Sequence, residues 1–277
     1  MIVWALISKI ENTEMNNLLA AVQDTIGVEL SDYAQSSLQR RIIRFNEIAR
    51  IANMDELIKK IRNESGFAVH FINEITVNVS EMFRDPSFWA IIRDSVLTEL
   101  SNRSIINIWH AGCSQGEEVF TMAIILKEAG LLSKTRITAT DINVNTLKIA
   151  ENGIFLLKSQ ELNHKNYVRY GGKGLLSDYY KVVENKVHFD KELIRKVEFK
   201  KHDLSSDQHF AFFDLIICRN VFIYFNFNLQ EKALAIFNQS LSKDSFLGIG
   251  SKESIAYCKG SRYLNALSLK EKIFRRI

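Results

Sequence analysis

Residues 106–120, INIWHAGCSQGEEVF, run from an apolar segment through a loop of small residues into a second apolar segment that begins with two acids. The first segment, taken as 104–111, is typical of a short buried strand, and residues 116–130 are typical of a helix. Strand, loop and helix in this order are the unit of a parallel α/β sheet, whose ligands bind at the carboxyl ends of the strands. The loop between the two segments is therefore the first candidate binding site.

The same alternation continues toward the C-terminus. We expect further strands at 136–142, 196–204, 213–221, 245–251 and 271–277, and further helices at 143–153 and 229–242. This order predicts an α/β fold with a parallel sheet covered by helices on both faces. Residues 154–197 interrupt the alternation, and 179–189, with a turn at Glu184-Asn185, predict an inserted antiparallel hairpin.

The N-terminal region has helical periodicity and no strand alternation. Helices are expected over 12–30, 33–53 and 54–63, with Ser31-Asp32 as the N-cap of the second and Gly66 closing the third. We therefore expect a small all-helical domain at 1–72. A larger domain follows at 73–277 and carries the β insertion at about 165–197.

Composition places the chain among ordinary globular proteins. Of 277 residues, 47% are hydrophobic and 25% charged, and the net charge of +4 is too small to indicate nucleic acid or a membrane as partner. Three widely spaced cysteines predict reduced thiols and a cytoplasmic protein. The opening segment 1–14 is expected to be a buried helix, because it lacks a basic start and is too short to span a bilayer.

The loop after the first strand has the wrong chemistry for a phosphate. Gly112 and Gly116 form G-x-x-x-G rather than the dinucleotide pattern G-x-G-x-x-G, and Glu117 stands where a diphosphate would need a helix N-terminus free of acids. A carboxylate there favours a ligand with a positive group. S-adenosylmethionine fits, since its sulfonium and amino groups are cationic and it has no phosphate.

Asp141 ends the second strand, where an acid can accept hydrogen bonds from both hydroxyls of a ribose. This position serves NAD and S-adenosylmethionine equally well. On spacing alone, a glycine-containing turn followed by an acid also fits an N-cap or a solvated loop.

Five separated blocks carry a resemblance to a known family. They are NVSEMFRDP (78–86), IWHAGCSQGEEVF (108–120), TATDIN (138–143), KKHDL (200–204) and FDLIICRNVFIYF (213–225). In these blocks and their order the chain resembles the CheR-type chemoreceptor glutamate methyltransferases. The resemblance implies a Rossmann-like S-adenosylmethionine-dependent methyltransferase sheet with a small antiparallel β subdomain, preceded by an all-helical domain.

The resemblance also implies roles for individual residues. Glu117 matches the acid that binds the amino end of the cofactor, Asp141 matches the acid that binds ribose, and Asp203 with Leu204 matches a pair beside the adenine. The remaining cofactor contacts would be Asn78, Ser80, Arg84, Ala111, Gly112, Arg219 and Asn220. Arg84 and Tyr224 would be catalytic, and no metal is implied.

The implied reaction asks little chemistry of the protein. A glutamate side chain is ionised at neutral pH and needs no general base to attack a sulfonium methyl. The protein would align the carboxylate and remove water from it. Arg84 could hold the carboxylate with its planar guanidinium and Tyr224 could orient it. A simpler interpretation pairs Arg84 with Asp85, and one for Tyr224 makes it a core aromatic.

A basic helix could dock the receptor. Arg40 and Arg44 are four residues apart and share one helix face with Arg41 nearby, and the cytoplasmic methylation helices of chemoreceptors are acidic. A solvated helix face is an equally good interpretation. Glu118 is more typical of a solvated or structural residue than of a ligand.

Several functions remain open. Gln115 and Asp203 depart from the Thr and Asn usual in the family, and an ionised Asp cannot donate a hydrogen bond to adenine. The acceptor could be another signalling protein, or the chain could be a non-catalytic S-adenosylmethionine-binding module. Pro86 is the only proline, which excludes the Pro-containing motifs of nucleic-acid methyltransferases. An NAD oxidoreductase fits least, because the phosphate-binding pattern is missing.

Overall fold

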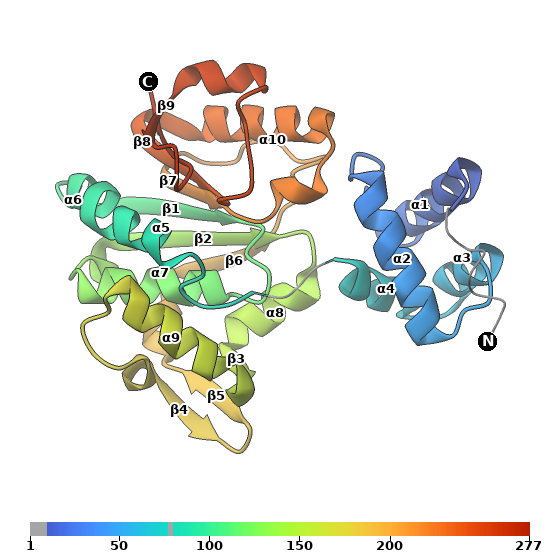
Figure 1. Ribbon diagram of the computed structural model, residues 1–277, viewed down its shortest axis with the longest axis horizontal. Helices are drawn as coiled ribbons and strands as arrows, with labels where there is room; N and C mark the ends of the chain where they lie inside the picture. The colour runs from blue at the N-terminus through green and yellow to red at the C-terminus, as the bar shows by residue number, and fades with distance from the viewer. Residues whose placement is uncertain (1–9, 77–79) are drawn as a thin grey trace. The chain divides into compact units, whose positions relative to one another are not determined.

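The 106–120 stretch forms an interior strand and its following helix, as its pattern predicts (Figure 1). Strand β1 (Ile106–Ala111) pairs in parallel with β2 (Thr135–Asp141) on one side and with β7 (Phe213–Cys218) on the other. Helix α7 (Glu117–Glu128) follows directly. Because the three strands are parallel neighbours, the loops that follow them meet at one edge of the sheet.

The computed structural model describes residues 10–76 and 80–277. Within these ranges the chain forms two units. The helical unit consists of 10–76 with 224–229, and the sheet unit consists of 80–223 with 230–277. The first nine residues of the expected opening helix lie outside the described residues. No helix in the described ranges is long and apolar enough to cross a bilayer.

The main sheet is mostly parallel, which confirms the predicted Rossmann-like class. In the described part of the chain its strand order is β6-β2-β1-β7-β8-β10-β9. The strands not yet described are β6 (Val197–Lys201), β8 (Leu241–Ile249), β9 (Leu264–Ser268) and β10 (Ile273–Arg276), of which β6 and β9 form the edges. β6 and β8 are parallel to their inner neighbours, whereas β10 is antiparallel to β8 and to β9. β9 was not predicted, because its side chains are mostly exposed and show no buried alternation.

Helices cover both faces of this sheet. Successive side chains of β1 point to opposite sides, so this strand packs against helices on each face. Ile108 joins a buried cluster with Trp89 of α5 (Pro86–Ile91) and the apolar side of α7. Trp109 points to the other face, where its ring lies 5.3 Å from that of Phe237 in α10 (Phe227–Ser240). The other helical segments are η2 (Ile92–Val96), α6 (Leu97–Leu100), η3 (Leu132–Lys134), α8 (Val144–Asn152), η4 (Leu157–Ser159), α9 (Gln160–Tyr170), η5 (Leu176–Tyr179), η6 (Lys191–Ile194), η7 (Phe222–Tyr224) and η8 (Lys259–Tyr263).

A small antiparallel sheet follows α8. The expected hairpin is present as β4 (Tyr180–Val183) and β5 (Lys186–Phe189), and Glu184 in its turn has a left-handed backbone. A third strand, β3 (Ile154–Leu156), pairs with β5 and was not expected. Three residues are too few to show the alternation by which strands are recognised in a sequence.

The helical unit contains α1 (Asn12–Ile26), α2 (Gln35–Ala49), α3 (Met54–Asn63) and α4 (Phe67–Ile75). Its core is built from one apolar side of each helix, including Leu18, Ile42, Leu57 and Phe71. The sequence indicated the first three helices. Gly66, expected only to close α3, is the N-cap of α4.

The predicted N-cap of α2 is wrong. The helix begins at Gln35 after Ala34, and Ser31-Asp32 makes no cap. Asp32 is engaged elsewhere: its carbonyl accepts a hydrogen bond from the Asn226 backbone and its carboxylate accepts one from the Asn226 side chain. A partner this distant in sequence leaves no local signal.

Phe120 provides a test of the contact between α7 and the small sheet. Its ring is fully buried and lies 5.6 Å from the ring of Phe155 and 5.2 Å from that of Phe189. We predict that Phe120→Ala lowers the free energy of unfolding of the sheet unit by about 3–5 kcal/mol, because it leaves a cavity. Urea denaturation followed by tryptophan fluorescence would measure this.

The matched control is Phe212→Ala, since Phe212 is 65% exposed. Its effect should stay below about 1 kcal/mol. Equal losses for the two variants would contradict the role given to Phe120.

Candidate functional site

Two glycines shape the loop between β1 and α7. Gly112 has φ +77°, and a Cβ at this position would lie 2.5 Å from Cγ2 of Val221. Gly116 has φ +98°, and its Cβ would lie 2.7 Å from Cβ of Ala150. Both the backbone conformation and the close approach therefore require glycine. The backbone amide of Gly112 donates to the carbonyl of Thr140, which holds the loop against the end of β2.

Asp141 is fixed at the end of β2 by backbone donors. Its Oδ2 accepts from the Ser114 amide and its Oδ1 from the Asn143 amide, both at 2.9 Å. Burial raises the pKa of this carboxyl, while the two backbone hydrogen bonds oppose the rise. A carboxylate oxygen can accept more than one hydrogen bond, so this group can also accept from a ligand's hydroxyls.

Glu117 is a buried acid with one unsatisfied carboxylate oxygen in the described part of the chain. It is 8% exposed, and its Oε2 has no hydrogen-bond partner among the described residues. Burial raises its pKa to about 7. Buried polar atoms are normally satisfied, so an orphaned carboxylate oxygen points to a ligand that supplies a donor or a positive charge.

Glu117 also lines a cavity of about 310 Å³ between α7, the end of α8 and the small sheet. Ser80, Gln115, Asn163 and Lys186 contribute polar atoms to its wall. The cavity thus combines an acid, a lysine and several uncharged donors. Sequence reasoning included Ser80 and Glu117 but gave no role to Asn163 or Lys186, which lie outside the recognised motifs.

Glu118, the next residue, has a structural role. Its carboxylate lies 3.0 Å from Nδ1 of His110 and 3.2 Å from Nη1 of Arg219. Burial works against the charged form, but the His110 hydrogen bond and the Arg219 charge outweigh it and lower the pKa of Glu118. No group of three acids, histidines or cysteines suited to a metal ion occurs in the described ranges.

Arg219 lies just beyond the end of β7, and its side chain is 1% exposed. Its Nη2 is 2.5 Å from Oδ2 of Asp85 and 3.2 Å from the carbonyl of Arg84, and the guanidinium stacks 4.3 Å above the ring of Phe88. The resemblance placed Arg219 among the cofactor contacts. In the structure its hydrogen bonds go to protein groups.

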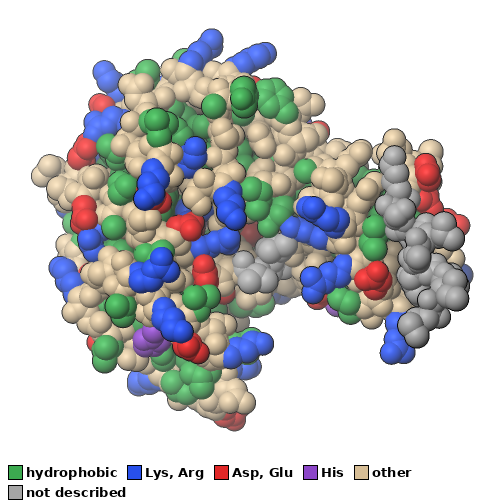
Figure 2. Space-filling model, viewed as in Figure 1, with side chains coloured by type: hydrophobic (Ala, Val, Ile, Leu, Met, Phe, Trp, Pro, Cys, Tyr) green, Lys and Arg blue, Asp and Glu red, His purple; other side chains and the backbone are tan. Residues whose placement is uncertain are grey.

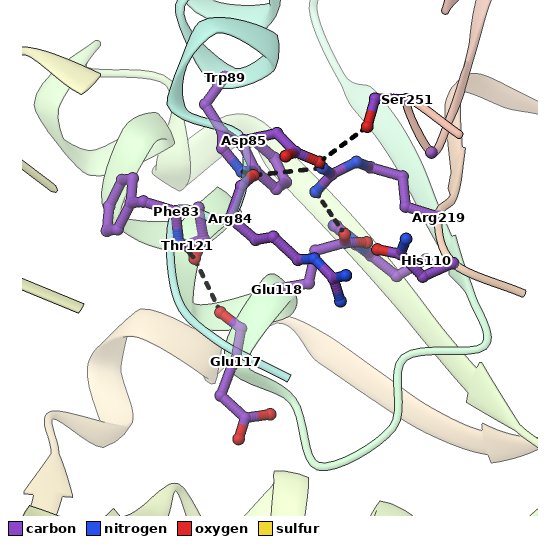
Figure 3. Close-up of polar contacts among 12 residues, drawn as sticks. Phe83, Arg84, Asp85, Trp89, His110, Glu117, Glu118, Thr121, Arg219 and Ser251 are labelled. Atoms are coloured by element: carbon purple, nitrogen blue, oxygen red, sulfur yellow. Dashed lines mark hydrogen bonds and ion pairs between the residues drawn. The ribbon is translucent and has the colours of Figure 1, made fainter. Parts of the chain in front are cut away.

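Arg84 itself is left unpaired. The simpler interpretation, a pair with Asp85, is not formed, because Asp85 binds Arg219. The Arg84 side chain is half-buried and makes no polar contact with another described residue. Figure 3 shows it extending away from Asp85 and Trp89, and no dashed line reaches its guanidinium. A positive charge is thus presented without a counter-ion among residues 10–76 and 80–277.

The adenine pair of the resemblance lies in a tight turn after β6. Asp203 is buried, and its Oδ1 accepts from the Ser205 amide and hydroxyl at 2.8 and 2.7 Å. Its own amide donates to Asp207. Leu204 is buried beside it. The Asp203 carboxylate therefore organises its own loop, a task that an acceptor-only side chain performs well.

Other expected contacts are placed at the strand ends. Ala111 is the buried last residue of β1. Asn220 has φ +60°, and its amide donates to Glu253. Asn78 lies outside the described residues.

Glu253 is an organising residue that sequence reasoning missed. Its carboxylate accepts from the backbone amides of Gly250, Asn220 and Ile223, and so holds the loop after β7 in place. Burial raises its pKa, and these hydrogen bonds counter the rise. The available signal was the GSKES segment at 250–254, an acid shortly after a buried strand.

Tyr224 belongs to the helical unit. Its carbonyl accepts from the Ala34 amide, and its ring lies 4.3 Å from the guanidinium of Arg41. Arg41 also donates to the carbonyl of Ile75 at 2.7 Å. Arg40 and Arg44 are exposed, whereas Arg41 is half-buried, so the three arginines do not form one exposed group.

Comparison with known proteins agrees with this arrangement. Residues 78–271 match the family described as CheR methyltransferase, SAM binding domain, and residues 13–76 match CheR methyltransferase, all-alpha domain. The chain is similar to the putative methyltransferase Cher3 of Pseudomonas putida, with 36% identity over 263 residues, 95% of this chain and 96% of that protein.

Two chemotaxis protein methyltransferases are also similar. The protein of Borreliella burgdorferi is 31% identical over 278 residues, 95% of each chain. The protein of Listeria innocua is 30% identical over 241 residues, 84% of this chain and 87% of that one. The family resemblance is confirmed: the chain belongs to the CheR methyltransferase family and is an S-adenosylmethionine-dependent methyltransferase.

Proposed function

We propose that the protein methylates glutamate side chains on the cytoplasmic helices of chemoreceptors, forming glutamate methyl esters. The relatives named as chemotaxis protein methyltransferases support the receptor as partner. The observation that carries the acceptor class is the unpaired guanidinium of Arg84. Its neighbour Asp85 is neutralised by Arg219, so the charge of Arg84 remains available for an incoming carboxylate.

The cofactor fits the unsatisfied groups of the sheet edge. S-adenosylmethionine supplies an electrophilic methyl group on a positively charged sulfur. Glu117 would hold its ammonium group, since the Glu117 carboxylate is buried with an unpartnered oxygen. Asp141 would accept the ribose hydroxyls. Ser80, Ala111, Asp203, Leu204, Arg219 and Asn220 remain proposed contacts.

The acceptor needs alignment rather than activation. A glutamate carboxylate is ionised at neutral pH, so no side chain has to remove a proton from it. Arg84 would bind it through two parallel N–H donors, which fixes its direction as well as its position. Tyr224, by the family resemblance, would help to orient the acceptor.

Docking of an acidic receptor helix falls to Arg40 and Arg44. Both are exposed on α2, one turn apart, whereas Arg41 is engaged with Ile75 and Tyr224. Figure 2 shows Lys and Arg side chains on the face of the helical unit that it draws. Exposed arginines favour an acidic partner mainly through the rate of association.

Replacement of Glu117 by Gln tests the ammonium site. We predict at least a roughly tenfold loss of S-adenosylhomocysteine affinity in calorimetric titration at about pH 8. In the wild type, affinity should fall below pH 7, because the free carboxyl, whose pKa burial raises to about 7, then holds a proton. In Glu117→Gln this pH dependence should be absent.

The same variant should stabilise the ligand-free protein. The pKa of Glu117 is raised from its ordinary value of 4.5 to about 7, so its proton is bound more tightly in the folded state. Its contribution to stability is therefore lost as pH rises through 7, and the glutamine avoids a cost of roughly 1–3 kcal/mol at about pH 8. The exposed Glu151→Gln serves as control, and an unchanged affinity in Glu117→Gln would refute the assignment.

Replacement of Arg84 by Ala tests the acceptor. With a tritiated cofactor and a receptor cytoplasmic fragment, we predict a roughly 100-fold slower transfer, and S-adenosylhomocysteine affinity should change less than about threefold, a change worth under 0.7 kcal/mol. The transferred label should be released as methanol by mild base, as expected of a carboxyl ester.

The other outcomes are informative. Full transfer by Arg84→Ala would remove Arg84 from the reaction, and parallel losses in rate and affinity would assign it to the cofactor. Base-stable label would mean a different acceptor group. Cofactor binding without transfer to any protein would indicate a non-catalytic module.

The docking proposal predicts a salt-dependent defect. Arg40→Glu with Arg44→Glu should raise the KM for the receptor fragment roughly tenfold at low ionic strength with little change in kcat. The difference should shrink as salt is added. Lys243→Glu with Lys259→Glu, both exposed, makes the same change in net charge and should leave KM unaltered. Equal effects of the two pairs would contradict specific docking.

A further inference from the structure

The segment before α5 is tied down at each residue from Met82 to Asp85. Met82 donates its amide to Asn163 at 3.0 Å and accepts at its carbonyl from Asn166 at 3.1 Å, both in α9. The following residues are tied to α7 and to the end of β7. Only the Arg84 side chain extends from this loop without a partner among the described residues (Figure 3).

The tie to α7 is one hydroxyl. Oγ1 of Thr121 accepts from the Phe83 amide at 3.0 Å and donates to the carbonyl of Glu117 at 2.8 Å. Thr121 is fully buried. A hydroxyl has one donor and two acceptor positions, so it can serve both partners at once. The residue before Arg84 is thereby linked through one atom to the first residue of α7.

The tie to β7 is the buried guanidinium of Arg219. It donates to the carbonyl of Arg84 and pairs with the carboxylate of Asp85, and the indole of Trp89 donates to the same carbonyl at 2.9 Å. A second carboxylate, that of Glu118, holds the opposite side of the guanidinium. Arg219 is thus fixed from α7 while it fixes the loop.

The loop needs these ties because its conformation is unfavourable. Phe83 and Asp85 both have φ +54°, in the left-handed region that residues with a Cβ adopt rarely. Such conformations persist where the surroundings over-determine them, and they are concentrated at functional sites. Two left-handed residues on either side of Arg84 set the direction in which its side chain leaves the chain.

We propose that Thr121 and Arg219 are positioning residues that hold the Arg84 guanidinium in register with Glu117. Because α7 carries both Glu117 and Thr121, the group that would bind the cofactor and the group that would bind the acceptor share one rigid frame. The inference rests on the proposed role of Arg84 in binding the acceptor.

Thr121→Val is the main test, since it removes the hydroxyl at nearly constant volume. Hydrogen exchange should become faster in the peptide spanning residues 80–85 and stay unchanged in α7. Methyl transfer to the receptor fragment should slow roughly 10- to 100-fold, as expected for a displaced aligning group. The affinity for S-adenosylhomocysteine should change less than about threefold, and Thr121→Ser should restore both exchange and rate.

A double-mutant cycle separates positioning from general stability. If Thr121 acts through Arg84, Thr121→Val should have little further effect on the rate in an Arg84→Lys background. Arg219→Lys should slow transfer as Thr121→Val does, because it loses the planar guanidinium. Ser251→Ala is the matched control: the exposed Ser251 hydroxyl is 3.5 Å from the same Asp85 carboxylate, and its loss should change nothing.

Several results would overturn the inference. These are equal slowing by Thr121→Val in both backgrounds, no rescue by Thr121→Ser, and unchanged exchange at 80–85 in Thr121→Val. If the wild type transfers no methyl to glutamate, the proposed acceptor is wrong. The exchange measurement still decides whether Thr121 fixes the loop.

Discussion

Buried charge at the carboxyl edge of the sheet is balanced around one guanidinium. Arg219 pairs with both Asp85 and Glu118, and His110 binds the other oxygen of Glu118. Without Arg219, the Glu118 carboxylate, whose side chain is only 17% exposed, would lose its cationic partner, which is destabilising. The balance has a functional side, because the charges that remain unpaired, on Glu117 and Arg84, are those to which ligand binding is assigned.

Most of the proposed ligand-binding residues at this edge were predicted from the sequence, but few of the contacts that hold them in place were. Gly112 follows β1 directly, Asp141 ends β2, and Glu117 begins the helix after β1, so local pattern and family motif both identify them. Thr121 lies in an apolar helix, and its role is seen only in the structure, where its hydroxyl accepts a hydrogen bond from the Phe83 amide. Arg219 was recognised by motif, but its partners Asp85 and Glu118 are 134 and 101 residues away. Contacts at that separation leave no periodic signal.

Secondary structure was lost where elements are short or lack a pattern. β3 has three residues, and β9 is mostly exposed. The difference between Arg41 and its neighbours has another cause. Successive residues of a helix point about 100° apart, so arginines that are close in the sequence need not share a surface. Arg41 turns inward and binds the carbonyl of Ile75.

The motif that ends β7 is divided between the two units. Its first part, through Ile223, remains with the sheet unit, while residues 224–229 complete the helical unit. Phe225 pairs with Tyr33, and Asn226 binds Asp32, 194 residues earlier in the chain. During synthesis, helices α1 to α4 therefore leave the ribosome long before residues 224–229, which complete their unit. A fragment cut after the last of these helices would therefore lack part of its own structure.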